Sequence, residues 1–168
     1  TAYFCKARRP GRVFLVSAML AFVPLTRSTH TAVSVAIADT RKTLPGLRAL
    51  QKYAVTCGGG KNHRYNLSDC AMLKDNHIDA CGGIEKAVSI LREKIGHTVK
   101  IEVETRNLDE VAQALRAKAD IIMLDNMDND TMKKAVELID GRALSEASGG
   151  ITHDTIAGVA KTGVDIIS

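Results

Sequence analysis

The sequence contains no tryptophan, and aromatic residues make up only 4% of its 168 residues, so aliphatic side chains must supply the core. Its four cysteines form no Cys-x-x-Cys pair, which excludes zinc ribbons and thioredoxin-type redox chemistry and indicates free thiols in a reducing compartment. The net charge of +4 is too small to imply a nucleic-acid partner, although it leaves small anions as ligands.

The first 34 residues differ in pattern from the rest of the chain. Basic residues at positions 6–12 precede an apolar run at residues 13–25, an order typical of a secretory signal. That run is shorter than the roughly 20 residues of a membrane-spanning helix. The sequence that follows is similar to those of cytoplasmic metabolic enzymes, and this resemblance favours a cytoplasmic location and no membrane partner. We therefore interpret residues 1–34 as a disordered or non-native segment and residues 35–168 as the folded domain.

Short apolar runs alternate with amphipathic patterns from residue 35 onward. Strands are predicted at residues 34–39, 72–74, 100–104, 121–125, 143–148 and 164–167. Helices are predicted at residues 46–55, 84–95, 107–115, 132–139 and 152–162. Asn107 is expected to cap its helix, with Glu110 as a capping-box partner. This alternation predicts βαβ units around a parallel sheet.

Six such strands fit either an α/β barrel or a doubly wound sheet. Side chains alternate across a strand, so Glu102 and Glu104 share one face of their strand while Ile101 and Val103 share the other. A charged inner face suits the interior of a barrel near its active end, and it favours the barrel. A doubly wound sheet with charges at its strand ends is the alternative.

Two carboxylates stand at the ends of consecutive predicted strands. Glu104 and Asp125 lie one βα unit apart and should face the same mouth of the sheet. Hard carboxylate oxygens suit Mg²⁺, which usually takes one or two protein ligands. The alternative is that these carboxylates form salt bridges with Lys74.

Other groups near the strand ends are suited to anions. Ser148, Gly149 and Gly150 follow a strand and precede a predicted helix, so their backbone N–H groups could approach a phosphate; a simple turn is the alternative. The planar fork of an arginine at position 41 or 64 matches a carboxylate. A Schiff-base role for a lysine at position 74 is less favoured than an electrostatic one, because nothing nearby indicates a depressed pKa.

The chain resembles the quinolinate phosphoribosyltransferase family over roughly 130 residues, from position 37 to position 168. The matching motifs occur in family order at residues 39–43 (DTRKT) with 45–46 (PG), 62–64 (NHR), 74–78 (KDNHI), 102–104 (EVE), 123–127 (MLDNM), 147–151 (ASGGI) and 163–168 (GVDIIS).

The resemblance implies an open, incomplete α/β barrel with six parallel strands in this chain, and a homodimer or higher homo-oligomer of the full-length enzyme. It assigns quinolinate to four residues: Arg41, His63, Arg64 and Lys74. It places Lys42 near phosphoribosyl pyrophosphate. It gives a catalytic role to Lys42, Glu104 and Asp125. Glu104 and Asp125 are assigned to ribose and Mg²⁺, and Ser148 and Gly149 to the 5′-phosphate of the donor.

The activity implied by the resemblance is phosphoribosyl transfer to quinolinate with decarboxylation, giving nicotinate mononucleotide, pyrophosphate and CO₂. Because the family's N-terminal domain and its last phosphate-binding loop are not recognisable, the domain is expected to be C-terminally truncated. One alternative is therefore a catalytically incompetent fragment that binds the donor weakly. Another is a related barrel that binds a different phosphosugar, although His63 and Arg64 beside Arg41 argue against it.

Overall fold

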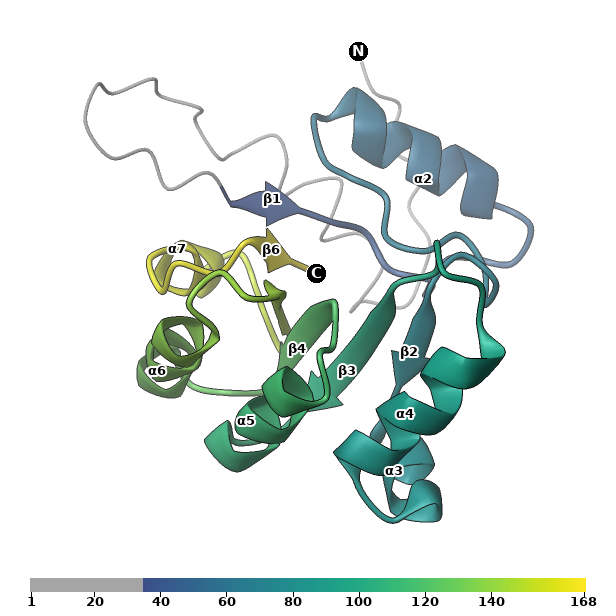
Figure 1. Ribbon diagram of the computed structural model, residues 1–168. Coiled ribbons are helices and arrows are strands. Elements are labelled where there is room, and N and C mark those ends of the chain that lie inside the picture. Colours follow the sequence, from purple (N-terminus) through teal and green to yellow (C-terminus); the bar gives the residue numbers. More distant parts are fainter. Residues whose placement is uncertain (1–34) are drawn as a thin grey trace.

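The structure is a computed structural model, and it describes residues 35–168. Its centre is one sheet of six parallel strands in the order β1-β6-β5-β4-β3-β2 (Figure 1). The strands are β1 (Ala36–Ile37), β2 (Ala71–Leu73), β3 (Ile101–Thr105), β4 (Ile121–Asp125), β5 (Leu144–Ser148) and β6 (Ile166–Ile167). The predicted open barrel of six parallel strands is confirmed.

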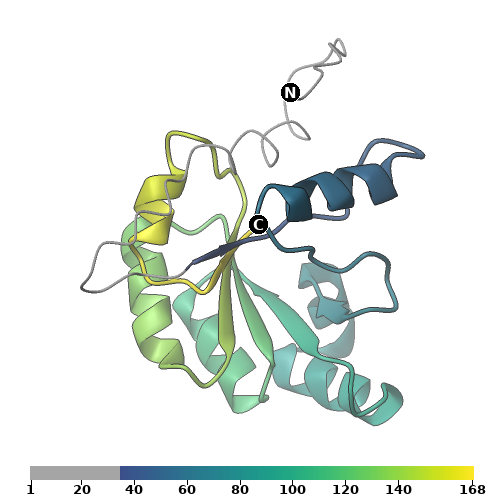
Figure 2. The ribbon, with the colours of Figure 1, turned by 90° about the horizontal axis from the view of Figure 1, so that it is seen from above.

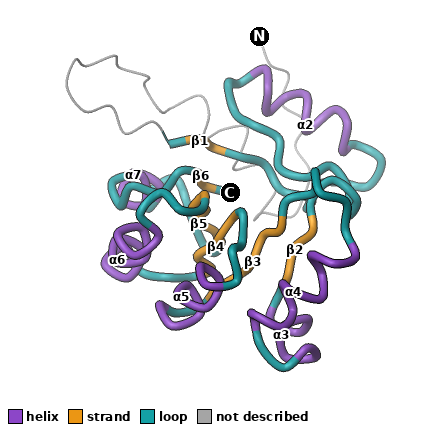
Figure 3. Tube along the Cα trace, viewed as in Figure 1, coloured by secondary structure: helices purple, strands orange, loops and turns teal. Residues whose placement is uncertain are grey.

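Six helices connect these strands. They are α2 (Arg48–Cys57), α3 (Asp75–Cys81), α4 (Ile84–Lys94), α5 (Leu108–Arg116), α6 (Asn129–Ile139) and α7 (Ile156–Ala160). Helices α3 to α7 follow one side of the curved sheet, whereas α2 stands apart from them beyond β1 (Figures 1 and 2). The strands therefore gather at the centre with most of the helices around them (Figure 3).

Two helices differ from the sequence prediction. Helix α3 was not predicted, because its seven residues are too few to show a clear apolar period. Helix α7 is shorter than the predicted 152–162. The Thr155 hydroxyl accepts a hydrogen bond from the Thr152 N–H and donates one to the Thr152 carbonyl, so side chains replace the first helical turn there.

The cap of α5 is formed as predicted on one side only. The Asn107 side chain accepts from the Glu110 N–H at 2.9 Å. The Glu110 carboxylate instead accepts from the backbone N–H and the guanidinium of Arg106. The second hydrogen bond of the capping box, from the Asn107 N–H to the Glu110 side chain, is therefore replaced by contacts with Arg106.

The sheet is open between its two edge strands. On the outer side of β1, a single parallel bridge joins Ala38 to Lys61, in the segment that follows α2. Lys61 N–H donates to Ile37 and Asp39 N–H donates to Lys61, at 2.8 and 3.0 Å. The chain after α2 thus extends the sheet by one short step toward β2 without closing it.

The two faces of the sheet differ in chemistry. One face packs against the helices and holds apolar residues such as Val103 and Leu124, both fully buried. On the other face, register places Glu104 level with Met123, and Met123 level with Glu146. Since registered neighbours in a sheet point the same way, this inner face carries the carboxylates of Glu104 and Glu146 with Met123 between them.

The predicted segment 1–34 lies outside the described residues. None of the helices within residues 35–168 has both the length and the apolar character needed to span a bilayer.

Candidate active site at the carboxyl edge of the sheet

The sequence-predicted groups follow the carboxyl ends of five strands. Arg41 and Lys42 come after β1, Lys74 follows β2, Glu104 lies near the end of β3, and Asp125 and Ser148 end β4 and β5. All six strands are parallel, so these ends meet at one edge of the sheet. The shared edge is the basis for treating these residues as one site.

Lys74 and Glu104 form an ion pair across β2 and β3. The Lys74 Nζ lies 2.5 Å from Glu104 Oε2, with the lysine side chain 46% exposed and the glutamate 15% exposed. The Asp125 carboxylate instead accepts from the Asn126 side-chain amide at 2.8 Å. The salt bridge considered as an alternative is therefore present for Glu104 and absent for Asp125, within the residues that the structure describes.

Three other cations are available to a ligand. The side chains of Arg41 and Lys42 have no polar partner within residues 35–168, and Lys42 is exposed. Within the same residues, the Arg64 guanidinium donates only to the Met72 sulfur, a weak acceptor 3.1 Å away. These positive groups retain most of their hydrogen-bonding capacity for an anion.

His63 lies against two buried carboxylates on the inner face. Its Nε2 is 3.2 Å from Glu102 Oε2 and 3.5 Å from Glu146 Oε1. The hydrogen bond to Glu102, and then the nearby Glu146 carboxylate, raise the pKa of His63 to about 9. The Arg64 N–H donates to His63 Nδ1 at 2.8 Å and opposes this shift, because a second ring proton would face that N–H.

The backbone of His63 is fixed by a buried ion pair. Asp39 accepts from the Lys52 Nζ at 2.6 Å and from the His63 N–H at 2.8 Å. Lys52, only 1% exposed, also donates to the His63 carbonyl at 2.9 Å. With its amide oriented to donate, Asn62 adds a 2.7 Å hydrogen bond to Asp39. This network joins α2, the end of β1 and the segment that carries His63.

The loop after β5 offers backbone donors. Gly149 and Gly150 have φ angles of +92° and +62°, and the N–H groups of Gly149, Gly150 and Ile151 have no acceptor within residues 35–168. Ser148 O accepts from Asn126 N–H, which ties this loop to the end of β4. Successive unpaired N–H groups of this kind suit an anion. The predicted helix N-terminus is not adjacent, because α7 begins only at Ile156.

Four residues at the site were missed by the predicted set: Asp39, Lys52, Glu102 and Glu146. Glu146 could have been found from its spacing, since it precedes Ser148 by two residues and therefore shares its face of the strand. Lys52 has no such signal, because a lysine on a surface helix is ordinarily solvated. Asp39 belongs to a recognised motif, but its carboxylate points to Lys52, so it serves the scaffold.

A separate hollow beside α5 and α6 does not belong to this set. It is lined by residues that include Arg106, Asn107, Asn126, Asp128 and Thr131. Asn107 and Asp128 cap the two helices there, and Arg106 is paired with Glu110. Capping accounts for much of the polarity of this hollow.

The carboxyl edge of this open parallel barrel combines free cations, carboxylates and unpaired backbone donors. These features are typical of the α/β barrels that bind small polyanionic molecules. Comparison with known proteins identifies the family. The chain belongs to the quinolinate phosphoribosyl transferase family, with residues 18–168 matching its C-terminal domain. The match begins inside the segment 1–34, so the predicted boundary at residue 35 stays a prediction.

Several relatives are close in sequence and structure. A probable nicotinate-nucleotide pyrophosphorylase (carboxylating) of Synechocystis is 47% identical over 160 residues, covering 92% of this chain and 54% of that protein. A Bacillus subtilis protein of the same description is 49% identical over 132 residues, covering 79% and 46%. The nicotinate-nucleotide pyrophosphorylase structure from Francisella tularensis has a TM-score of 0.81 at 42% identity, covering 93% and 53%. The chain thus spans about half the length of these relatives.

Proposed function

We propose that this domain carries the chemistry of a quinolinate phosphoribosyltransferase. In this reaction the pyridine nitrogen of quinolinate attacks C1 of phosphoribosyl pyrophosphate, and the C1–O bond breaks with its electrons going to pyrophosphate. The carboxyl at position 2 then leaves as CO₂, a proton takes its place on the ring, and the product is nicotinate mononucleotide. The proposal is supported by family membership and by the names of the relatives.

One structural observation carries the proposal for this chain. Cations without strong partners, two partly exposed carboxylates and a loop of unpaired N–H groups lie along one edge of a parallel sheet. A dicarboxylate, a ribose and a phosphate need those three kinds of group. Most of the acceleration would come from positioning and from charges fixed before reaction.

The dicarboxylate subsite is assigned to the arginines at positions 41 and 64, with His63 and Lys74. Each guanidinium offers two parallel N–H donors to a carboxylate, which fixes the pyridine ring as well as neutralising it. Arg64 supports this assignment because its guanidinium donates only to a thioether within residues 35–168. Lys74 is at present neutralised by Glu104, so its role depends on that pair opening.

The donor subsite is assigned to Lys42, Ser148 and Gly149. Lys42 is exposed and unpaired within the described chain, so it is suited to the pyrophosphate leaving group. Unpaired N–H groups at Gly149 and beyond are suited to the 5′-phosphate. Glu104 and Asp125 would hold the ribose hydroxyls and stabilise positive charge that develops at C1.

Mg²⁺ fits the carboxylates of Glu104 and Asp125. Both offer hard oxygen donors, and the Glu104 oxygen already binds a cation, the Lys74 ammonium. When bound there together with the donor, the ion would neutralise the charge of the leaving pyrophosphate. A divalent cation would compete with Lys74 for the same carboxylate.

The proposal extends to assembly and location. A homodimer or higher homo-oligomer is proposed for the full-length enzyme, together with a cytoplasmic location. Plant relatives are described as mitochondrial or chloroplastic. The proposed cytoplasmic location therefore concerns this protein and does not extend to the whole family.

Calorimetry with separate ligands tests the proposal. The purified chain should bind phosphoribosyl pyrophosphate in the presence of Mg²⁺, and it should bind quinolinate more tightly than nicotinate, which lacks one carboxylate. Phthalate, which keeps both carboxylates but has no ring nitrogen, should bind without reacting. Equal affinity for quinolinate and nicotinate would contradict the dicarboxylate assignment, and absence of binding to both substrates would contradict the function.

A further inference from the structure

Two buried glutamates on the inner face have fewer partners than their burial demands. Glu102 of β3 and Glu146 of β5 are 0% and 1% exposed. Within residues 35–168, Glu102 Oε1 and both carboxylate oxygens of Glu146 have no hydrogen-bond partner. Leaving buried polar atoms unsatisfied costs about 1–3 kcal/mol each, and more when the group is charged. A pair that weakens the fold in this way calls for a functional explanation.

Both carboxylates converge on one ring nitrogen. His63 Nε2 is 3.2 Å from Glu102 and 3.5 Å from Glu146, and the Cys70 thiol is 3.9 Å from the same Glu102 oxygen. The opposite nitrogen, Nδ1, accepts from the Arg64 N–H. The ring is therefore held at both ends, with its Nε2 hydrogen directed into the barrel.

A metal ion is the other reading of this cluster. The ligand atoms of His63, Glu102 and Glu146 lie within 4.8 Å of one another, close enough to hold one ion. A metal at Nε2 would leave the ring hydrogen on Nδ1, where metal-ligating histidines usually donate to an acceptor. Here Nδ1 faces the Arg64 N–H, which is a donor. The ring geometry therefore favours a hydrogen on Nε2 over a metal.

We propose that Glu102 and Glu146 are positioning residues of the dicarboxylate site, which fix the His63 ring through its Nε2 hydrogen and thereby the backbone at Arg64. The Asp39–Lys52 pair fixes the N–H and carbonyl of His63, while the two glutamates fix its side chain. The backbone and the ring of His63 are then both held in place. The Arg64 guanidinium, whose contact is the Met72 sulfur, keeps its donors for a carboxylate.

That the site binds quinolinate rests on the proposed function. The hydrogen bonding of the His63 ring does not depend on that function. The first measurement therefore needs no substrate. In ¹⁵N-edited NMR spectra of the histidine side chains, the His63 Nε2 hydrogen should be visible and protected from exchange with solvent. Glu102→Leu, which removes the acceptor, should lose that protection, and Glu102→Gln, which keeps an acceptor oxygen, should retain most of it.

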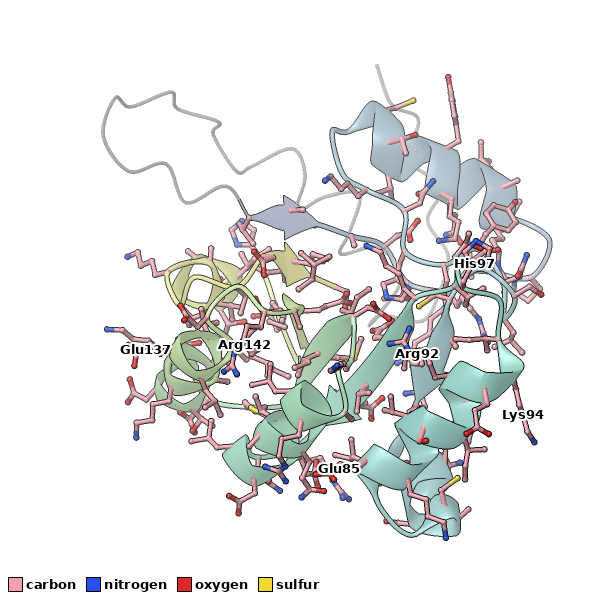
Figure 4. The ribbon with its side chains drawn as sticks, viewed as in Figure 1. Glu85, Arg92, Lys94, His97, Glu137 and Arg142 are labelled. Atoms are coloured by element: carbon pink, nitrogen blue, oxygen red, sulfur yellow. The ribbon has the colours of Figure 1, made fainter. Side chains whose placement is uncertain are left out.

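The second measurement is binding of the two substrates by calorimetry. Loss of one charge-assisted hydrogen bond corresponds to about a tenfold to hundredfold change in affinity. Glu102→Leu should weaken quinolinate by that factor and leave phosphoribosyl pyrophosphate unchanged, with Glu102→Gln and Glu146→Gln intermediate. Unchanged donor binding also shows that each variant is folded. Glu137→Gln on the exposed face of α6 is the matched control and should change nothing (Figure 4).

Two results would overturn the inference. One is a His63 Nε2 hydrogen that is absent, or that exchanges equally fast in the wild type and in Glu102→Leu. The other is stoichiometric binding of Zn²⁺ or Mn²⁺ that Glu146→Gln abolishes, which would assign the cluster to a metal. If the wild-type chain binds neither substrate, the proposed function fails, and the NMR measurement still decides the geometry.

Discussion

At the scale of single residues, depth in the barrel separates the roles of the carboxylates. Glu104 and Asp125 lie at the mouth, partly exposed, with a lysine and an asparagine amide as partners. Glu102 and Glu146 lie deeper and are fully buried, and three of their oxygens have no partner within residues 35–168. The mouth pair can exchange partners with a ligand or ion, whereas the deep pair is proposed to act on the His63 ring that it contacts.

The arginines at positions 41 and 64 should govern quinolinate binding selectively. Replacing either by alanine removes a forked donor matched to a carboxylate, so quinolinate affinity should fall by about tenfold or more while donor affinity changes little. Calorimetry with each substrate alone checks this. Similar losses for both ligands would contradict the assignment. Arg142→Ala is the control, because Arg142 (Figure 4) lies in the turn before β5, at the amino and not the carboxyl edge of the parallel sheet.

The mouth carboxylates should set the magnesium requirement. Glu104→Gln and Asp125→Asn each remove a charged oxygen ligand and should weaken the metal-dependent state by about 1–3 kcal/mol. Donor binding titrated with Mg²⁺ should then need more of the ion in both variants. If both variants give the same titration curve as the wild type, Glu104 and Asp125 do not bind the metal. Their roles are then limited to the Lys74 salt bridge and the Asn126 amide contact.

At the scale of elements, the loops after β4 and β5 hold each other in place. A Cβ on Gly149 would lie 2.5 Å from Asn126 Cγ and 2.8 Å from the Asn126 backbone nitrogen. Asn126 itself has a positive φ of 53°, and its N–H donates to the Ser148 carbonyl. The glycine is therefore required both by its backbone conformation and by a close approach to a neighbouring loop.

Gly149→Ala should destabilise the fold and displace the proposed phosphate loop. The clash involves backbone as well as side chain, so the cost should be about 1–3 kcal/mol, and donor affinity should fall with it. Gly141→Ala is the matched control, because Gly141 has φ +67° but no heavy atom within 4 Å of an added Cβ. Both variants carry the backbone strain, but only Gly149→Ala carries the close contact. Chemical denaturation should therefore show a larger loss of unfolding free energy in Gly149→Ala. Equal losses in the two variants would contradict the role of the contact.

At the scale of the whole molecule, the sheet is not closed by hydrogen bonds between β1 and β2, so other contacts must cover its inner face. The bridge from Ala38 to Lys61 extends the sheet past β1, and the buried Lys52–Asp39 pair ties α2 to that edge. His63, carried on the same segment, reaches across to β3 and β5. The site therefore depends on a segment that is joined to the sheet by a single bridge and held by side chains.

Lys52→Met should test this dependence. Removing one partner of a buried ion pair leaves Asp39 uncompensated and typically costs about 3–5 kcal/mol. Thermal and denaturant unfolding should show a loss of that order, and quinolinate binding should weaken more than donor binding because His63 loses its anchor. Lys61→Met, at an exposed position, should have little effect. A small loss in Lys52→Met would mean that the segment is held by other contacts.

Much of the fold was predictable, because local patterns in the sequence record it. All six predicted strands are found, and the Asn107 cap follows from a side chain three residues from the N–H that it binds. Helix α3 was missed and α7 was overextended, since short helices depend on tertiary contacts and on competing side chains such as Thr155. Local pattern thus specifies the long elements better than the short ones.

The sequence by itself determined the parallel α/β architecture, the placement of charged groups at the strand ends and, through its motifs, the family. Tertiary structure alone decided which of those groups meet. It paired Lys74 with Glu104 and not with Asp125, used Lys52 to fix His63, and brought Glu146 to the same ring as Glu102. The reason is physical: strand and helix periods fix the direction of each side chain locally, whereas the register between strands and the path of the α2–β2 segment fix its partners.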